Sequence, residues 1–556
     1  MKMTYASQRL SLRFFMLMLL LFGLQVSYGL LLAAQQADPS LLAGTLNFNV
    51  IRASHLTLGI LWIVCGFIGA TLFVAPLLAR RDIAAPALVK LLFYALIAIV
   101  IWNVSTQVLS MRGEAGWWLG QPWLINGLEY LEGGRIFGFA LLVGFILLAF
   151  IVLRTFPPVK QWNEVHWGLG LGISALVLVW IFGLFYVSRL DLQEYFRWYV
   201  VHYWVEGVWE VIHISLIGIL IVLMFKASVR SVGFAVFWGI TLVWLSGLIG
   251  NAHHYFWVGT PEFWQFWGSF FSAMEPVPLV FCFWHIYLDA HANKRPLENA
   301  PAFYFILGST VLELVGAGIL GFVMTFALTN AWSHGTWITA GHGHLALFGT
   351  FGMLGIGAAY WAVPAVRKAP DFDQRLGKLG FWFLFTGILG MALSFAFGGM
   401  VQAYVIRILG LEWVGGDVAP AMGVFKLTLP LFGFLFAAGA AIVIYDLATL
   451  GKPAPVPSEI LPATGWRRPL SGFEAGIWLA FICLFGMVIT FSLLAFNLPR
   501  VRVEGDPTLP YLLGGVGYLG LFGVTLGFVL RFTASLGARL RTPAPALATP
   551  DLSAAT

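Results

Sequence analysis

The sequence predicts an all-α polytopic membrane protein, and three observations support this fold class. Of the 556 residues, 60% are hydrophobic and only 10% are charged, whereas about a quarter are charged in a typical soluble domain. Apolar runs of about 20 residues, enough to cross a bilayer as a helix, recur along most of the chain. Lys and Arg residues gather in alternate connecting segments, as the positive-inside rule expects.

The apolar runs, taken in order, predict about fourteen membrane helices. We place them at residues 14–34, 55–77, 86–108, 136–154, 167–188, 198–224, 231–252, 263–288, 302–328, 339–364, 378–400, 421–446, 472–496 and 510–532. The first run has no small-residue cleavage site, so we expect a retained helix and not a signal peptide. With the N-terminus in the cytoplasm, inside segments hold 22 of the 31 basic residues and outside segments hold eight.

A Pro-rich segment, GKPAPVPSEILPATG, divides the predicted helices into two groups. We expect a helical core at 1–450, a cytoplasmic linker at 451–470, two further transmembrane helices within 471–534 and a tail at 535–556. The tail is rich in Ala, Pro and Thr, a composition that favours disorder.

Cysteine and charge patterns exclude several classes of protein. Cys65, Cys282 and Cys483 fall singly in apolar runs, which argues against a disulfide framework and a cysteine-based metal site. No Cys-x-x-Cys-His motif occurs, so a covalently attached c-type haem is not expected. The basic residues lie in short loops between apolar runs, and we therefore expect no nucleic-acid partner.

Six of the eleven histidines fall at one depth, in the outer half of the predicted bundle. They are His55, His202, His253, His254, His342 and His344. A lone interfacial histidine is more often a hydrogen-bonded structural residue, but six at one level favour metal binding, because imidazole is the commonest metal ligand. The structural interpretation suits the other five better, namely His166, His213, His285, His291 and His334.

The spacing of these histidines divides them into sets. His342 and His344 are two residues apart, about 200° around a helix, so each can bind a different metal but not the same one. Gly341 and Gly343 remove side-chain bulk that would obstruct a flat porphyrin close to the backbone. The adjacent His253 and His254 end a helix, where both rings can turn towards one ion, and His202 supplies a third imidazole.

Acidic residues accompany the three-imidazole set. In VVHYWVEGVWEVIH, His202, Glu206 and Glu210 recur every four residues and so share one helix face. The carboxylate of Glu206 adds a hard oxygen ligand, which favours iron over copper. Glu210 is either a protonated structural residue or a catalytic one, while Glu275, beside two prolines, is better explained by function. The segment EYLE, residues 129–132, could by itself be a solvated acidic loop.

Taken together, these motifs resemble a known family. Five motifs are similar to those of one enzyme subunit, namely WVEGVWE (204–210), NAHHYFWVG (251–259), SAMEPVP (272–278), HGTWITAGHGHLALFG (334–349) and EYLE (129–132). That subunit is the catalytic, cytochrome b subunit of cytochrome-c-dependent nitric oxide reductases, within the haem–copper oxidase superfamily. The resemblance covers about residues 10–450. It implies a twelve-helix haem–copper oxidase subunit I-like core, to which the last two predicted helices are an addition.

The resemblance also implies two b-type haems, one non-haem iron and a calcium ion. The residues it assigns to the haems are His55 and His344 as axial ligands of a low-spin haem b, and His342 as proximal ligand of a high-spin haem b. The residues it assigns to the non-haem iron are His202, His253, His254 and Glu206. The remaining carboxylates are Glu275 near that centre, Glu210 in a hydrogen-bonding role below it, Glu129 as calcium ligand, and Glu132 nearby on a proton route.

The activity implied by this resemblance is the reduction of two NO to N2O and water with two electrons and two protons. Such an enzyme serves denitrification in a respiratory electron-transport chain of the bacterial cytoplasmic (inner) membrane. Its N-terminus would be cytoplasmic, and its active site and proton supply would lie in the periplasmic half. The expected electron donor is a separate subunit, a membrane-anchored c-type cytochrome, with a copper-containing subunit as the alternative.

Two other functions remain open from the sequence. One is a terminal oxidase that reduces O2 and contains copper. In such oxidases a tyrosine of the sixth helix stands at the position that Glu206 occupies here, so Tyr203 or Tyr255 would have to take its role. The other is a haem-binding membrane protein without catalysis. Glu313 and Lys426 have no counterpart in the family pattern and could serve a structural ion pair or an inner proton path.

Overall fold

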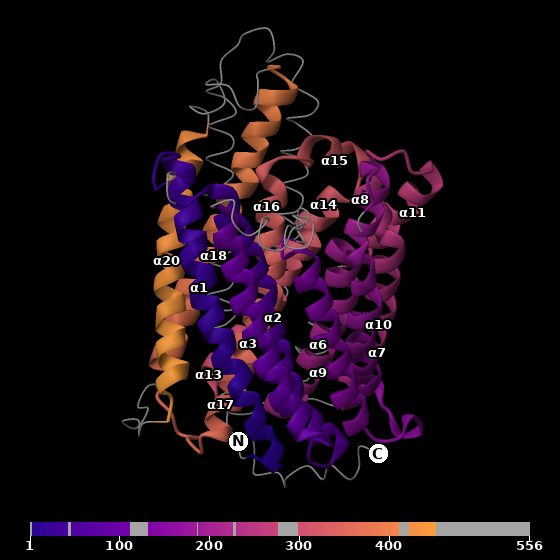
Figure 1. Cartoon of the computed structure of the whole chain (residues 1–556), viewed down its shortest axis with the longest axis vertical. Coiled ribbons are helices and arrows are strands. Elements are labelled where there is room, and N and C mark those ends of the chain that lie inside the picture. Colours follow the sequence, from indigo (N-terminus) through magenta and orange to yellow (C-terminus); the bar gives the residue numbers. More distant parts are fainter. Residues whose placement is uncertain are drawn as a thin grey trace, which may run out of the picture.

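The protein is a bundle of long helices that run along its longest dimension (Figure 1). The computed structural model describes residues 3–42, 46–111, 132–185, 187–225, 229–275, 298–410 and 422–451. Within these ranges helices form almost all of the secondary structure, and eleven of them are long and apolar enough to cross a membrane. The predicted all-α, multi-pass membrane fold is therefore confirmed.

The first half of the described chain supplies the helices between residues 6 and 273. They are η1 (Ala6–Leu10), α1 (Ser11–Ala37), α2 (Phe48–Ala79), α3 (Pro86–Met111), α6 (Gly134–Thr155), η2 (Val159–Gln161), α7 (Glu164–Trp180), η3 (Ile181–Leu184), α8 (Leu190–Trp198), η4 (Tyr199–Trp209), α9 (Glu210–Phe225), α10 (Val229–Gly250), η5 (Asn251–Tyr255) and α11 (Glu262–Ala273).

The second half of the described chain adds the helices that enclose the centre. They are α13 (Ala300–Leu312), η6 (Glu313–Leu320), α14 (Gly321–Met324), α15 (Ala327–Ser333), α16 (Trp337–His344), η7 (Leu345–Gly352), α17 (Met353–Val366), α18 (Arg375–Arg407) and α20 (Gly423–Thr449).

Most helix positions agree with the sequence prediction, but the second helix begins seven residues earlier, at Phe48, the eleventh ends seven residues later, at Arg407, and the sixth and eighth helices also differ. The sixth span begins at Leu190 and not at residue 198, because the amphipathic helix α8 runs directly into η4 and α9. For the eighth, predicted at 263–288, the described part is α11. The predicted helices at 472–496 and 510–532 lie outside the described residues, as does the chain organisation predicted beyond residue 451.

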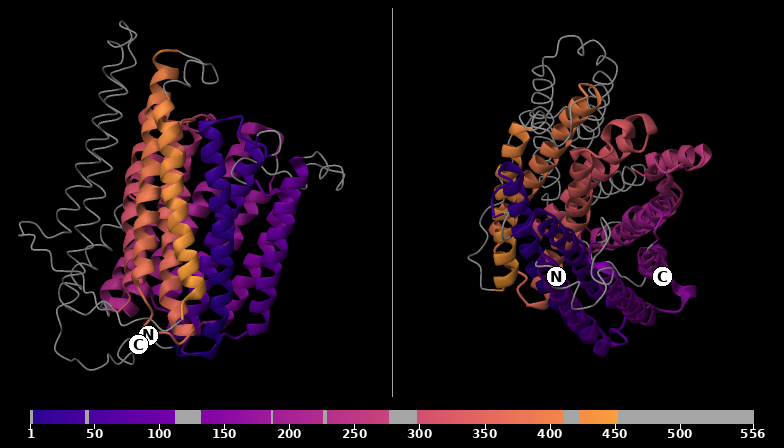
Figure 2. Two further views of the ribbon diagram at one scale, coloured as in Figure 1. Left: turned by 90° about the vertical axis from the view of Figure 1, so that its left-hand side faces the viewer. Right: turned by 45° about the horizontal axis from the view of Figure 1, so that its top comes forward.

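The helices that carry the candidate haem ligands are the most enclosed ones. Within their apolar windows, 94% of residues are buried in the span that contains α2, and 89% in the span that contains α16, η7 and α17. In contrast, α1 and α20 pack against each other at the side of the bundle, where α1 also contacts α2 and α20 contacts α18 (Figure 2). A buried position strengthens electrostatic interactions and excludes water from the bundle centre.

Side-chain caps set where these two helices begin. The side chain of Asn47 accepts a hydrogen bond from the Asn49 amide at the start of α2, and that of Thr336 accepts one from the Ile338 amide at the start of α16. Such caps satisfy amide groups that have no partner within the helix. They therefore help to define the depth at which His55 and His342 enter the bundle.

Three segments of the bundle core are wound as π-helices, namely η4, η6 and η7. The π-helix is rare and occurs frequently at functional sites. Here η4 contains His202 and Glu206, while η7 begins directly after His344. The prediction of one uniform α-helical stripe through Glu210 is therefore wrong in its winding, because α-helix resumes only at Glu210.

Candidate metal centre

Three imidazoles meet where η4 and η5 approach each other. The ring centroids of His202 lie 4.8 Å from those of both His253 and His254, and the latter two are 4.2 Å apart. His254 Nε2 lies 3.1 Å from His202 Nδ1. The adjacent His253 and His254, in η5 directly after α10, therefore do turn towards His202, as their position predicts, and His202 and His253 are buried.

Two carboxylates extend this cluster. Glu206 Oε2 lies 2.9 Å from His202 Nδ1, one turn further along η4. Glu275, which follows α11, joins the same group, since one side-chain oxygen or nitrogen from each of His202, Glu206 and Glu275 lies within 4.8 Å of the others. Elements far apart in sequence thus bring two acidic and three imidazole side chains into one buried or partly buried cluster.

The residues of this cluster suit a cation. One ring nitrogen each of His202, His253 and His254 also lies within 4.8 Å of the others, close to the roughly 4 Å that separates opposite ligands of one ion. Among the described residues, His202 Nε2 and His253 Nδ1 are buried without a hydrogen-bond partner. Buried polar atoms normally have partners, and a metal ion would supply the missing one. The mixture of imidazole and carboxylate fits iron better than copper.

A second pair of imidazoles lies between α2 and α16. The rings of His55 and His344 face each other with centroids 6.2 Å apart and planes at 29°. This separation leaves room for one metal ion between two ring nitrogens, because metal–nitrogen bonds are about 2 Å long. The Nδ1 atoms point away, towards the carbonyl oxygens of Gln25 at 3.0 Å and Ala340 at 2.7 Å, and the Nε2 atoms are left to bind a metal.

His342 faces a different neighbour, as the spacing of two residues predicts. Its Nδ1 lies 2.9 Å from the carbonyl oxygen of Gly316 in η6, whereas the ring of His344 stacks on Phe395 of α18. The two imidazoles of α16 therefore leave the helix in different directions. Each has a backbone carbonyl at Nδ1, which can hold the ring in the tautomer that exposes Nε2.

The two glycines beside these histidines differ in role. A Cβ atom at Gly341 would lie 2.8 Å from the Ala392 carbonyl oxygen, so this glycine allows α16 to pack closely on α18. The prediction that Gly341 makes space for a porphyrin is therefore wrong. A Cβ at Gly343 would meet nothing within 4 Å, so the open space expected beside the backbone is present at this position.

Comparison with known proteins identifies the fold and the family. The family model described as cytochrome c and quinol oxidase polypeptide I matches residues 9–435. The chain belongs to this family. A nitric oxide reductase subunit of Stutzerimonas stutzeri is 28% identical over 456 residues, which are 81% of this chain and 96% of the relative. Cytochrome c oxidase subunit 1 of Thermus thermophilus is 23% identical over 58% of this chain and 61% of its own length.

Solved structures agree on the architecture. The cryo-EM structure of a haem–copper terminal oxidase dimer superposes with a TM-score of 0.63 at 15% identity, covering 92% of this chain and 99% of that one. The haem–copper oxidase subunit I fold expected from the motifs is thus confirmed. The chain is an oxidoreductase subunit of the cytochrome c and quinol oxidase polypeptide I family and is similar to a nitric oxide reductase subunit.

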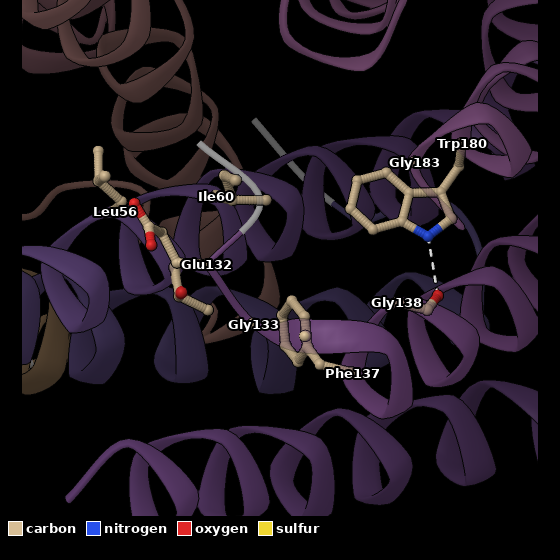
Figure 3. A pocket seen from close by; sticks show the side chains of 10 residues that line it. Leu56, Ile60, Glu132, Gly133, Phe137, Gly138, Trp180 and Gly183 are labelled. Atoms are coloured by element: carbon tan, nitrogen blue, oxygen red, sulfur yellow. Dashed lines mark hydrogen bonds between the residues drawn. The ribbon is translucent and has the colours of Figure 1, made fainter. Parts of the chain in front are cut away.

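Glu132 lies apart from the metal cluster. Its Oε1 is 3.2 Å from Nη1 of Arg52, near the N-terminal end of α2, and it lines a small pocket with Leu56 and Phe137. Figure 3 shows this pocket, in which Trp180 donates a hydrogen bond to the Gly138 carbonyl. Glu132 is therefore near the His55 side of the bundle. Glu129, the predicted calcium ligand, lies outside the described residues.

Two features of the centre were not anticipated from the sequence. Trp198 stacks on His254 with ring centroids 3.8 Å apart and planes at 11°, and its indole donates a hydrogen bond to Glu194. The signal was present, because Trp198 continues the four-residue spacing of His202 and Glu206 one turn outwards. The second feature is a buried contact between His213 and Glu313: the sequence indicated a structural ion pair or a proton path for Glu313, but it did not indicate His213 as the partner.

The tyrosines that could serve an oxidase mechanism point elsewhere. The Tyr255 hydroxyl donates to the Tyr195 carbonyl oxygen and is in contact with the Asn251 amide, while the Tyr203 ring packs edge-on against Trp244. In the described structure neither hydroxyl has a hydrogen bond to the imidazole cluster.

Proposed function

We propose that this chain is the catalytic subunit of a nitric oxide reductase that converts two NO, two electrons and two protons into N2O and water. The observation that carries the proposal is the carboxylate pair, Glu206 and Glu275, beside the three-imidazole cluster. The similarity to a nitric oxide reductase subunit, along 96% of that relative, supports it. The hydrogen bonds of Tyr255 and the ring contact of Tyr203 with Trp244 provide no support for the oxidase alternative.

The cofactors follow from the donor sets. We assign a low-spin haem b to His55 and His344, a high-spin haem b to His342, and a non-haem iron to His202, His253, His254 and Glu206. A haem iron and a non-haem iron would bind and reduce two NO molecules side by side. We further propose calcium at Glu129, with Glu132 beside it.

The chain itself has three tasks in this reaction. The backbone carbonyls at His55, His342 and His344 orient the rings, so that Nε2 of each would be available to bind a haem iron. Glu206 would supply negative charge to compensate a bound ferric ion. Glu275, whose carboxylate lies close to that of Glu206, is suited to pass protons to the bound substrate.

The proposed setting is the bacterial inner membrane, with the N-terminus cytoplasmic and the metal cluster in the periplasmic half. Electrons would come from a separate subunit, because the chain contains no Cys-x-x-Cys-His motif for a c-type haem. The membrane-anchored c-type cytochrome remains the expected donor, and a copper-containing subunit is the alternative.

The test combines metal analysis with turnover. The purified full-length protein, supplied with an artificial electron donor, should consume NO and release N2O in a ratio of two to one. Glu206→Gln should lose most of this activity while retaining both haems. Sustained O2 reduction without NO consumption, with copper at the cluster, would replace the proposal by the oxidase alternative. Haem without either activity would favour the non-catalytic alternative.

A further inference from the structure

A second buried acid–base group lies deeper along the helix that carries the metal cluster. His213 on α9 and Glu313 at the start of η6 are in contact, with Nδ1 and Oε1 3.4 Å apart. Their side chains are 0% and 1% exposed, respectively. Burial of ionisable groups is costly unless they are paired, so this contact between two distant segments requires a reason.

The hydrogen bonds around His213 determine where its protons lie. The Ser309 hydroxyl is 2.6 Å from the Thr350 carbonyl oxygen, to which it can only donate. Its oxygen, 2.9 Å from His213 Nε2, must then accept a hydrogen bond from that nitrogen. With Nε2 protonated, His213 Nδ1 and the Glu313 carboxylate can hold zero, one or two further protons between them. We call His213 and Glu313 together the proton pair.

The proton pair is electrostatically connected to the metal cluster. Glu210 follows Glu206 by four residues and precedes His213 by three along the continuous η4–α9 segment, and it lies near enough to Glu206 and Glu313 for an electrostatic interaction with both. Glu275 interacts in the same way with Glu206 and Glu210. Ser309 and the Phe351 ring are uncharged neighbours of the pair. In a buried, low-dielectric region a change of charge at the cluster is therefore felt at Glu313.

We propose that the His213–Glu313 pair is a proton-binding site that takes up one proton when one electron enters the metal cluster. In the oxidised protein the pair shares one proton and is neutral. On reduction the cluster gains one negative charge, and the pair binds a second proton from solvent water. Glu313 is then a carboxylic acid and His213 an imidazolium. The net charge of the buried region stays constant.

This inference rests on the proposed function in one respect, namely that the cluster holds a redox-active metal. It adds a role for two residues that the nitric oxide reductase resemblance leaves unassigned. It also gives Glu210 a position between the metal cluster and the proton pair. Glu313 has both carboxylate oxygens buried without a hydrogen-bond partner among the described residues, as expected for a group that must accept a further proton.

The experiment is a reductive titration of the full-length, metal-loaded protein in weakly buffered solution with a pH indicator. It measures the protons bound per electron, and the midpoint potential of the non-haem metal as a function of pH. Glu313→Gln and His213→Gln should each take up about one proton fewer per reduced cluster, and the potential should depend less on pH. Asp446→Asn is the matched control, because this buried carboxylate accepts a hydrogen bond from Tyr360 at the α17–α20 contact.

Wild-type proton uptake and pH dependence in both variants would overturn the inference. If the variants fail to assemble, a second measurement on the wild type still tests the inference. Reduced-minus-oxidised infrared spectra of the wild type, with labelled histidine, should contain a carboxyl signal and an imidazolium signal that appear together. Absence of the imidazolium signal would also overturn it. Neither readout uses NO, so a metal-loaded protein without NO turnover contradicts the proposed function alone, whereas a protein without reducible non-haem metal contradicts both.

Discussion

The two sets of histidines in this bundle are held in position by different kinds of contact. His55, His342 and His344 each have Nδ1 close to a backbone carbonyl oxygen and extend Nε2 into the bundle. The cluster of His202, His253 and His254 instead has its rings against one another and against carboxylates. The first set is oriented by the fold itself. The second set needs a cation to hold several polar groups together.

This difference predicts how each set responds to damage. A ring held by a backbone carbonyl keeps its tautomer and orientation when a neighbour changes, so the loss of one haem ligand should remain a local defect. The cluster shares one ion among several side chains, so the loss of one ligand should weaken all the others.

The largest effect is expected for His253→Ala. It removes one of three imidazoles from the shared ion, and since loss of an outer-shell partner alone costs about 10- to 100-fold, non-haem metal affinity and activity should fall by more than about 100-fold. Both haem spectra should remain. His334→Ala is the control, because this ring contacts Trp257 outside the cluster. Metal content and turnover near the wild type in His253→Ala would break the distinction between the two sets.

Selective loss of haems is the next largest effect. His55→Ala and His344→Ala should each abolish the low-spin haem spectrum and leave the high-spin haem, while His342→Ala should do the reverse. The reason is that His342 and His344 face different neighbours from one helix. Optical and EPR spectra of the three variants provide the measurement. Loss of the same haem in His342→Ala and His344→Ala would contradict this geometry.

Glu206→Gln tests the role of the negative charge within the cluster. Glutamine keeps the size of the side chain but removes the negative charge 2.9 Å from the His202 ring. Activity and iron retention should fall by about 10- to 100-fold, and the potential of the non-haem metal should rise. Glu206→Ala should be worse, since it also leaves a cavity. Glu262→Gln, on the exposed start of α11, is the control. Normal turnover in Glu206→Gln would exclude its carboxylate as an essential ligand.

Substitutions at Gly341 and Gly343 test helix packing and cofactor binding separately. Gly341→Ala places a methyl group 2.8 Å from the Ala392 carbonyl oxygen and should cost about 1–3 kcal/mol of stability. Gly343→Ala meets nothing within 4 Å and should leave the helix packing intact, but it should lower haem content if a porphyrin fills that space. Thermal unfolding and haem-to-protein ratios are the measurements. Equal thermal stability of the two variants would contradict the packing role of Gly341.

Trp198→Phe should give the smallest effect. Phenylalanine retains a ring to stack on His254 but loses the indole hydrogen bond to Glu194, so metal affinity should fall by about tenfold at most. Trp257→Phe is the matched control, because this indole also contacts a histidine, His334, and donates a hydrogen bond, to Asn330. A larger loss in the control than in Trp198→Phe would show that the stack does not support the cluster.

Local spacing along the chain predicted the fold and the groups of histidines. Apolar runs of membrane length predicted fourteen spans, eleven of which are present among the described residues, and the two-residue step from His342 to His344 predicted their different directions. The adjacent His253 and His254 likewise indicated a shared ion. These features depend on helix geometry within one segment, which sequence periodicity reports directly.

Contacts between distant segments could not be predicted in this way. His213 meets Glu313 and Ser309, and the His213–Ser309 contact joins residues 96 positions apart. No periodic pattern links such positions. The π-helical winding of η4 was also unexpected, because it leaves the four-residue contact of His202 with Glu206 in place. The haem assignments depended on resemblance to a family, since spacing indicates metal ligands but not the cofactor that they bind.

The most direct test of the central claim is the metal content of the purified full-length protein. Three imidazoles with a carboxylate at 2.9 Å from His202 predict iron in the shared cluster. Pyridine haemochrome analysis and elemental analysis should together give two b-type haems and one further iron for each polypeptide, without copper. Stoichiometric copper in place of the third iron would contradict the account.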